Sequence, residues 1–326
     1  MAQLFLVGIG AGVTAALLFA TLATGQAFAV GLFYLTPLPI LLAGIAWNHI
    51  AGAIAALTAA VILGSFLGLW FLLAFTIGIG LPAYILAYLA LLARTDEDED
   101  IEWYPAGRLV LAGALIAATA TALTVPAFGT DVESYRAALK EAFERVLRAQ
   151  TGTAAEQPLA LPGVQDTPRF LDFLVIIMPP TAAVLSMVTS LGNLWLAGRV
   201  ARMSGRLARP WPEFGELRFP PTAPLLLAAA VGGTFLPGIL AIVSGFFAAT
   251  LLMAYAILGF AIVHGASRAF GARAVLLTAM WVSVFLIGWP VLLAALIGIA
   301  DSFVDFRARL RGGGGTNLPT RRPPDE

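Results

Sequence analysis

The residues best suited to bind a ligand surround a pair of prolines in the apolar first part of the chain. Residues 37–40 read Pro-Leu-Pro-Ile, and prolines inside a helix leave backbone carbonyl groups that lipid cannot satisfy. A cavity at this break would be mostly apolar with a few orienting polar groups, as ligand pockets usually are. The sequence therefore predicts a site for an uncharged or amphipathic molecule, bounded by Gln26, Pro37, Pro39, Asn48 and His49. The alternative is a structural kink with His49 at the water interface.

A second constellation is a row of small residues at four-residue spacing. Gly8, Gly12, Ala16 and Ala20 lie on one face of the first apolar segment. Small residues along one face let two helices approach closely. This face is expected either to pack within the protein or to dock another membrane subunit.

The chain has few residues of the types that commonly take part in catalysis or metal binding. The chain has no cysteine and only two histidines, His49 and His264, and its single lysine, Lys140, lies in no glycine-rich loop. These features argue against thiol chemistry, histidine-rich metal sites and a Walker-type ATPase. We expect no catalytic residue, no metal and no cofactor, and we do not expect an enzyme.

Charged residues are few and unevenly placed. The 19 basic and 19 acidic residues cancel, which gives no reason to expect a nucleic-acid partner. The acidic run at 96–100 could hold a divalent cation, but a solvated, self-repelling loop is the preferred interpretation.

The elements that must position these residues are membrane-spanning helices. Apolar residues make up 60% of the 326 and charged residues 12%, whereas soluble domains are about a quarter charged. The first charged residue is Arg94. One crossing needs roughly 20 apolar residues, so the fold class is an all-α, polytopic transmembrane helical bundle with eight or nine spans and one external amphipathic helix.

Four parts follow along the chain. Residues 1–127 form an N-terminal five-helix membrane half, 128–168 an external helical insertion, 169–300 a C-terminal membrane half, and 301–326 a polar tail expected to be disordered. In the insertion, Thr130 and Glu133 fit a capping box, and an apolar residue every fourth position predicts an amphipathic helix over 131–150. Its apolar face must cover either the membrane surface or the mouth of the bundle.

The expected spans end at recognisable breakers. They are placed near 3–23, 27–46, 50–69, 72–92, 107–127, 170–198 with a kink at Pro179 and Pro180, twice within 219–267, and at 274–298. Five arginines in the loop 199–218 predict, by the positive-inside rule, that this loop is cytoplasmic. The N-terminus is then internal and the 131–150 helix external. Nine spans put the arginine-bearing tail outside, and a re-entrant segment at 222–236 would instead bring it inside.

The order of these features resembles a bacterial membrane protein family, the YybS-like proteins grouped as domain of unknown function 2232. The residues that carry the resemblance are Pro-Leu-Pro-Ile at 37–40, Pro82, the external insertion, Asn193 before the basic loop, and Gly-Ile-Ala-Asp at 298–301 followed by Asp305, Phe306 and Arg307. The first half is similar in turn to the substrate-binding S components of energy-coupling-factor transporters. That similarity implies docking on a transmembrane coupling subunit through small residues of the first helix.

The resulting hypothesis is a multi-pass protein of the bacterial inner membrane that binds a small or amphipathic molecule between its helices. Its partners would be the lipid bilayer and, for transport, a coupling subunit with an ATPase. The alternative is a non-transporting membrane scaffold or assembly factor that acts through the external helix and the arginine loop.

Overall fold

The computed structural model describes residues 1–95, 101–154 and 157–304, and helices account for most of them. The chain divides into two compact units. The first comprises Met1–Pro212 and Thr222–Ala254, and the second Glu213–Pro221 and Tyr255–Glu326. The all-α membrane bundle expected from the composition is confirmed.

The first four predicted spans are present, each ending where the sequence supplies a breaker. They are built from α1 (Ala2–Ala20), α2 (Ala27–Tyr34), α3 (Pro37–Ala46), α4 (His49–Leu67), α5 (Leu69–Phe75), a π-helical turn (Thr76–Gly80) and α6 (Leu81–Ala90). A 3-10 turn leads from α1 to Gly25, and Gly68 separates α4 from α5. Both glycines have positive φ angles, of 66° and 96°, which favour glycine because it lacks a Cβ atom.

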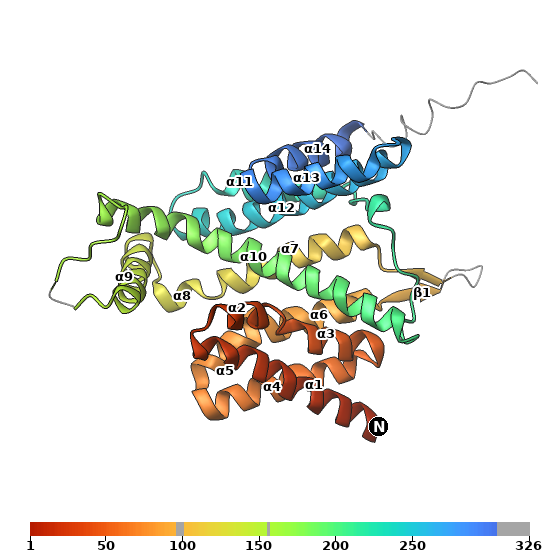
Figure 1. Ribbon diagram of the computed structural model, residues 1–326, viewed down its shortest axis with the longest axis horizontal. Helices are drawn as coiled ribbons and strands as arrows, with labels where there is room; N and C mark the ends of the chain where they lie inside the picture. The colour runs from red at the N-terminus through yellow and green to blue at the C-terminus, as the bar shows by residue number, and fades with distance from the viewer. Residues whose placement is uncertain (96–100, 155–156, 305–326) are drawn as a thin grey trace, which may run out of the picture. The chain divides into compact units, whose positions relative to one another are not determined.

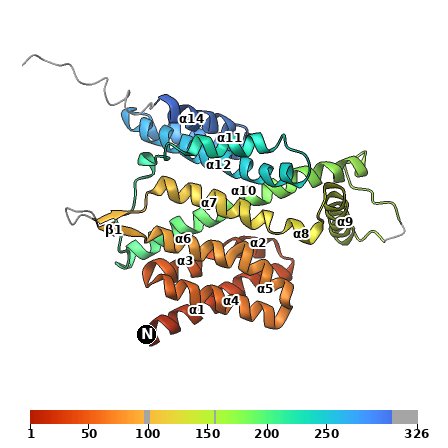
Figure 2. The ribbon, with the colours of Figure 1, turned by 180° about the vertical axis from the view of Figure 1, so that it is seen from behind.

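A short antiparallel hairpin follows, formed by β1 (Ala93–Thr95) and β2 (Ile101–Trp103) with Ala93 opposite Trp103. The chain continues through α7 (Ala106–Ala122), α8 (Val125–Phe128), α9 (Val132–Thr151) and α10 (Thr167–Met203). Figures 1 and 2 show α9 beside the N-terminal end of α10 and the hairpin near its C-terminal end.

The last helices are α11 (Ala223–Gly233), α12 (Ile239–Ala266), α13 (Arg273–Ile287) and α14 (Pro290–Val304). The boundary between the two units falls within α12, at Ala254 and Tyr255. In the second unit, α12 and α14 cross closely, since a Cβ atom at Gly259 would collide with the Ala294 backbone and one at Gly298 with the Tyr255 carbonyl.

The helix lengths correct two expectations about the spans. Residues 274–298 do not form one helix, because Gly288, with a φ angle of 77°, ends α13 and Pro290 starts α14. The sixth span is not interrupted by its prolines, because α10 is a single helix of 37 residues through Pro179 and Pro180. Within the described residues, seven helical segments are long and apolar enough to cross a membrane, and α11, α13 and α14 are shorter.

The amphipathic helix of the insertion is α9, and its apolar face packs against the bundle. Tyr135 and Leu139 are buried in a cluster with Val125 of α8, Val175 of α10 and Phe246 of α12. The N-cap is Asp131 rather than Thr130, because the Asp131 carboxylate accepts hydrogen bonds from the Ser134 amide and hydroxyl. The residue that completes the capping box is therefore Ser134, the third residue of the helix, and not the expected Glu133.

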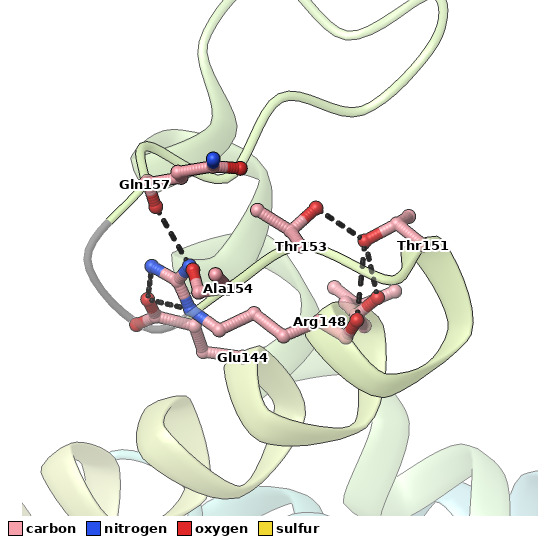
Figure 3. Close-up of polar contacts among 7 residues, drawn as sticks. Glu144, Arg148, Thr151, Thr153, Ala154 and Gln157 are labelled. Carbon is pink, nitrogen blue, oxygen red and sulfur yellow. Dashed lines mark hydrogen bonds and ion pairs between the residues drawn. The ribbon is translucent and has the colours of Figure 1, made fainter.

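The C-terminal end of α9 is fixed by one arginine (Figure 3). Arg148 pairs with Glu144 at 2.7 Å and donates from Nη1 to the carbonyl oxygens of Ala154 and Gln157. A cation at this position also suits the negative end of the helix dipole. The loop that follows α9 is therefore tied to the helix.

Three sequence-based expectations fall outside the described residues. They concern the acidic loop at 96–100, the resemblance residues Asp305, Phe306 and Arg307, and the tail beyond residue 304. The first four residues assigned to that tail, 301–304, are instead the last residues of α14.

Candidate functional site

The proline break between α2 and α3 is closed by a side chain from α10. Leu38 donates its amide hydrogen to Leu35, which leaves the Tyr34 carbonyl without its usual helical donor. Asn193 fills that role, donating from Nδ2 to the Tyr34 oxygen at 2.8 Å and to Thr189 at 2.8 Å. The break is thus satisfied within the protein, as the membrane environment requires.

The residues predicted to bound a cavity at this break are not brought together. Pro37 is buried and Pro39 half-buried at the start of α3, whereas Gln26 is exposed before α2. Asn48 caps α4, accepting a hydrogen bond from the Ile50 amide at 2.9 Å, and the His49 ring contacts Tyr88 edge-on, 5.5 Å between centroids.

A pocket of about 200 Å³ does lie beside the break. Pro37 lines it together with Tyr34 and the α10 residues Ser186, Thr189 and Ser190, but the other four predicted residues do not. Of the five predicted residues, only Pro37 lines this pocket, and α3 lies between Pro37 and Asn48 and His49; the five-residue site stays a prediction.

The small-residue face of α1 is occupied by α4. A Cβ atom at Gly8 would collide with Ile54, and one at Gly12 with the Ala55 carbonyl and Thr58. Ala16 is also buried, and only Ala20 is exposed. At Gly8 and Gly12 the face packs against α4 within the protein, and docking of a partner subunit on it stays a prediction.

Two of the loop arginines contact aromatic residues, and one of them is buried. The Arg206 guanidinium lies 4.6 Å from the centroid of the Trp47 ring. Arg209 is buried, donates from Nη1 to the Ala90 carbonyl at 2.8 Å, and lies 5.9 Å from the Trp103 ring. Its burial lowers the pKa of the guanidinium. These contacts join the end of α10 to α3, α6 and the hairpin.

An apolar hollow of the first unit lies where α9, α10 and the start of α12 meet. We call this pocket of about 400 Å³ the proline groove, because Pro179 and Pro180 form part of its wall. Its lining is almost entirely apolar. The residues are Tyr135, Arg136, Val175, Ile176, Ile177, Pro179, Pro180, Thr234, Ala241, Ile242, Gly245 and Phe246.

Gly245 of α12 lines the groove beside free space. A Cβ atom added there would meet no atom within 4 Å, in contrast to the tightly packed glycines of α1. The space next to Gly245 is therefore open, and a larger side chain at this position would extend into it.

One end of the groove is polar. A neighbouring pocket of about 170 Å³ shares Arg136, Val175 and Ile176 with the groove and adds Lys140 and Asp172. Lys140 pairs with Asp172 across α9 and α10 at 2.5 Å. An apolar channel with charged groups at one end matches the two parts of an amphipathic molecule.

Sequence reasoning missed this groove, although it noticed parts of it. The sequence predicts a kink at Pro179 and Pro180 and leaves open whether the apolar face of the 131–150 helix covers the membrane surface or the mouth of the bundle. The groove also needs α12, whose uniformly apolar sequence gives no sign of which face turns toward α10. The available signal was the coincidence of Arg136 and Lys140, four residues apart, on an otherwise apolar face.

Comparison with known proteins adds a family. A family model described as "Predicted membrane protein (DUF2232)" matches residues 12–302. No curated protein and no solved structure matches the chain significantly.

Proposed function

The chain belongs to the DUF2232 family of predicted membrane proteins, and from that premise we propose that it binds an amphipathic molecule in the proline groove. The observation that carries the proposal is the groove itself, a hollow of about 400 Å³ with an apolar wall and a charged end. Ligand pockets are typically about 300 to 1,000 Å³ with this composition. The apolar part of the ligand would replace lipid against α10 and α12.

The location differs from the one that the proline pair at 37–40 suggested. At that break Asn193 satisfies the freed carbonyl, and Asn48 is engaged in capping α4. At the proline groove, by contrast, α10 continues through Pro179 and Pro180 beside open space at Gly245. The class of ligand, a small or amphipathic molecule, is retained.

A filling substitution tests this proposal. Gly245→Leu should occupy the groove without colliding with the protein, since nothing lies within 4 Å of the added carbon. Mass spectrometry of molecules that copurify with the protein in mild detergent should show an amphipath with the wild type and a loss of it with Gly245→Leu. Gly10→Leu is the matched control, because Gly10 is an exposed helical glycine with equal free space.

If Gly245→Leu retains the same molecule at the same level, the groove is not the binding site. If a stable wild type carries no such molecule and takes none up when amphipaths are added, the alternative function of a scaffold or assembly factor is favoured.

Transport is a further part of the proposal and would need an energising partner, because the sequence shows no ATPase motif of its own. Copurification of a coupling subunit and an ATPase from native membranes would support it. Such a partner would have to contact a surface other than the Gly8 and Gly12 face, which α4 covers. We further propose a bacterial inner-membrane location with α9 on the external side.

A further inference from the structure

We propose that the ligand of the proline groove is a single-chain amphipath with a negatively charged headgroup, held between Arg136 and Lys140. This inference rests on the proposed function, since it specifies the ligand of the same groove. Its basis is the arrangement of charges at the polar end, where two cations and one carboxylate line the same pocket.

Arg136 is the cation available to a ligand. It lines both the groove and the neighbouring pocket, and its side chain is exposed. Among the described residues it has no hydrogen-bond or ion-pair partner, whereas Arg145 and Arg148 on the same helix are paired with Glu141 and Glu144. A guanidinium binds carboxylates and phosphates through two parallel hydrogen bonds.

Lys140 is the second cation, and a ligand can displace its ion-pair partner, Asp172. It lies one turn beyond Arg136 on α9, and residues four apart on a helix are neighbours about 6 Å apart at their Cβ atoms. The side chain of its partner Asp172 is 62% exposed, and exposed ion pairs contribute less than about 1 kcal/mol. An anionic headgroup could therefore contact both cations and displace Asp172 at little cost.

The apolar part of the site begins next to these charges. Asp172 and Pro180 are eight residues apart on α10, or about 12 Å at the helical rise. Between them Val175, Ile176 and Ile177 line the groove, and Gly245 and Phe246 face them from α12. The volume of about 400 Å³ lies at the low end for ligand pockets, which favours one apolar chain over two.

Charge and chain can be tested separately with two probes of equal length. We expect purified wild-type protein to bind hexadecanoate at least about tenfold more tightly than hexadecanol, equivalent to about 1.4 kcal/mol. Arg136→Gln should remove this preference by weakening hexadecanoate alone. Arg145→Gln is the matched control, because Arg145 is on α9 but does not line the groove.

Asp172→Asn distinguishes anion binding from a purely structural role, because only anion binding predicts an increase in the affinity for hexadecanoate. It removes the competing carboxylate and frees Lys140, so hexadecanoate should bind more tightly, by about threefold or more, with hexadecanol unchanged. Equal binding of the two probes in the wild type, or no weakening by Arg136→Gln, would overturn the anionic headgroup.

Gly245→Leu separates this inference from the proposed function. It should weaken both probes, because it fills the space for the chain. If it weakens both while the charge variants have no effect, the groove binds amphipaths without selecting anions. If it leaves hexadecanoate binding unchanged, the proposed function fails, and this inference fails with it.

Discussion

Asn193 on α10 donates a hydrogen bond of 2.8 Å to the backbone carbonyl of Tyr34, 159 residues earlier in the chain, at the point where α2 stops and α3 has not yet begun. The amide also donates to Thr189 on its own helix, while its Oδ1 atom is buried without a hydrogen-bond partner among the described residues. One polar side chain of α10 therefore ties that helix to the junction of α2 and α3.

The first prediction concerns this bond. Asn193→Leu should lower the free energy of unfolding by about 0.5 to 2 kcal/mol, in the range of interhelical hydrogen bonds in membranes. Thermal or detergent-induced unfolding of the purified protein measures the loss. Gln26→Leu is the control, because the exposed Gln26 caps nothing through its side chain; equal effects of the two changes would argue against a specific role for Asn193.

The second prediction concerns the face shared by α1 and α4. Gly12→Leu should destabilise the protein by about 1 to 3 kcal/mol, the usual cost of overpacking, because the added carbon atoms collide with Ala55 and Thr58. Gly10→Leu, on open backbone of the same helix, should not. A stable Gly12→Leu protein that loses only a copurifying subunit would instead support docking at this face.

The third prediction concerns Arg209. Arg209→Ala leaves the Ala90 carbonyl without its donor and should cost about 1 to 3 kcal/mol, as expected for a hydrogen bond to a charged group. Hydrogen exchange should also rise at the C-terminal turn of α6. Arg202→Ala, at an exposed position of the same basic segment, should stay within about 0.5 kcal/mol.

The fourth prediction is a pH dependence at the start of α9. Hydrogen bonds from Ser134 lower the pKa of Asp131 below its usual value of 3.8. Because the pKa is lower in the folded state, the stabilisation by this cap is complete above the unfolded pKa and is lost as the pH falls through the folded pKa.

Far-UV circular dichroism from about pH 6 to about pH 3 should therefore show α9 losing helix only at the acidic end, near and below the usual Asp pKa. Asp131→Asn should remove that dependence. Loss of helix already near neutral pH would assign the transition to another group.

The fifth prediction is the orientation of the two charged segments. The absence of native cysteine allows single-cysteine labelling at Arg145 and Ser204, both exposed. Arg145→Cys should react from the outside of intact cells and Ser204→Cys only after permeabilisation. The opposite pattern would invert the topology and place the charged end of the groove inside.

The sequence predicted helix boundaries best where a helix-breaking residue interrupts a run of apolar residues. Gly25 ends its helix because of its backbone conformation, and this boundary followed from residue types, whereas Gly68 fell inside the expected span 50–69 and in fact separates α4 from α5. Gly288 has the same role but was missed, because the apolar residues on both sides read as one span. Composition does not show whether a glycine in an apolar run continues a helix, as Gly245 does, or ends it.

The candidate site was harder to predict because it depends on packing between distant segments. The proline pair at 37–40 and the pair at 179–180 look equivalent as sequence. The structure distinguishes them, since Asn193 closes the first break while the second faces the space beside Gly245. Likewise, Arg209 resembled the other loop arginines, and only its contacts with Ala90 and Trp103 set it apart.

The helix break at Gly288 bears on whether the number of membrane crossings is odd or even. If α11, α13 and α14 each cross the bilayer, despite lengths that would require it to thin locally, the described residues make ten crossings rather than nine. An even number returns the C-terminal segment to the side of the N-terminus. Of the basic residues among those that the structure describes, only Arg136, Lys140, Arg145, Arg148 and Arg169 would then lie on the other side. Ten crossings would thus give a strong positive-inside asymmetry, and Thr316→Cys should then be labelled from the same side as Ser204→Cys.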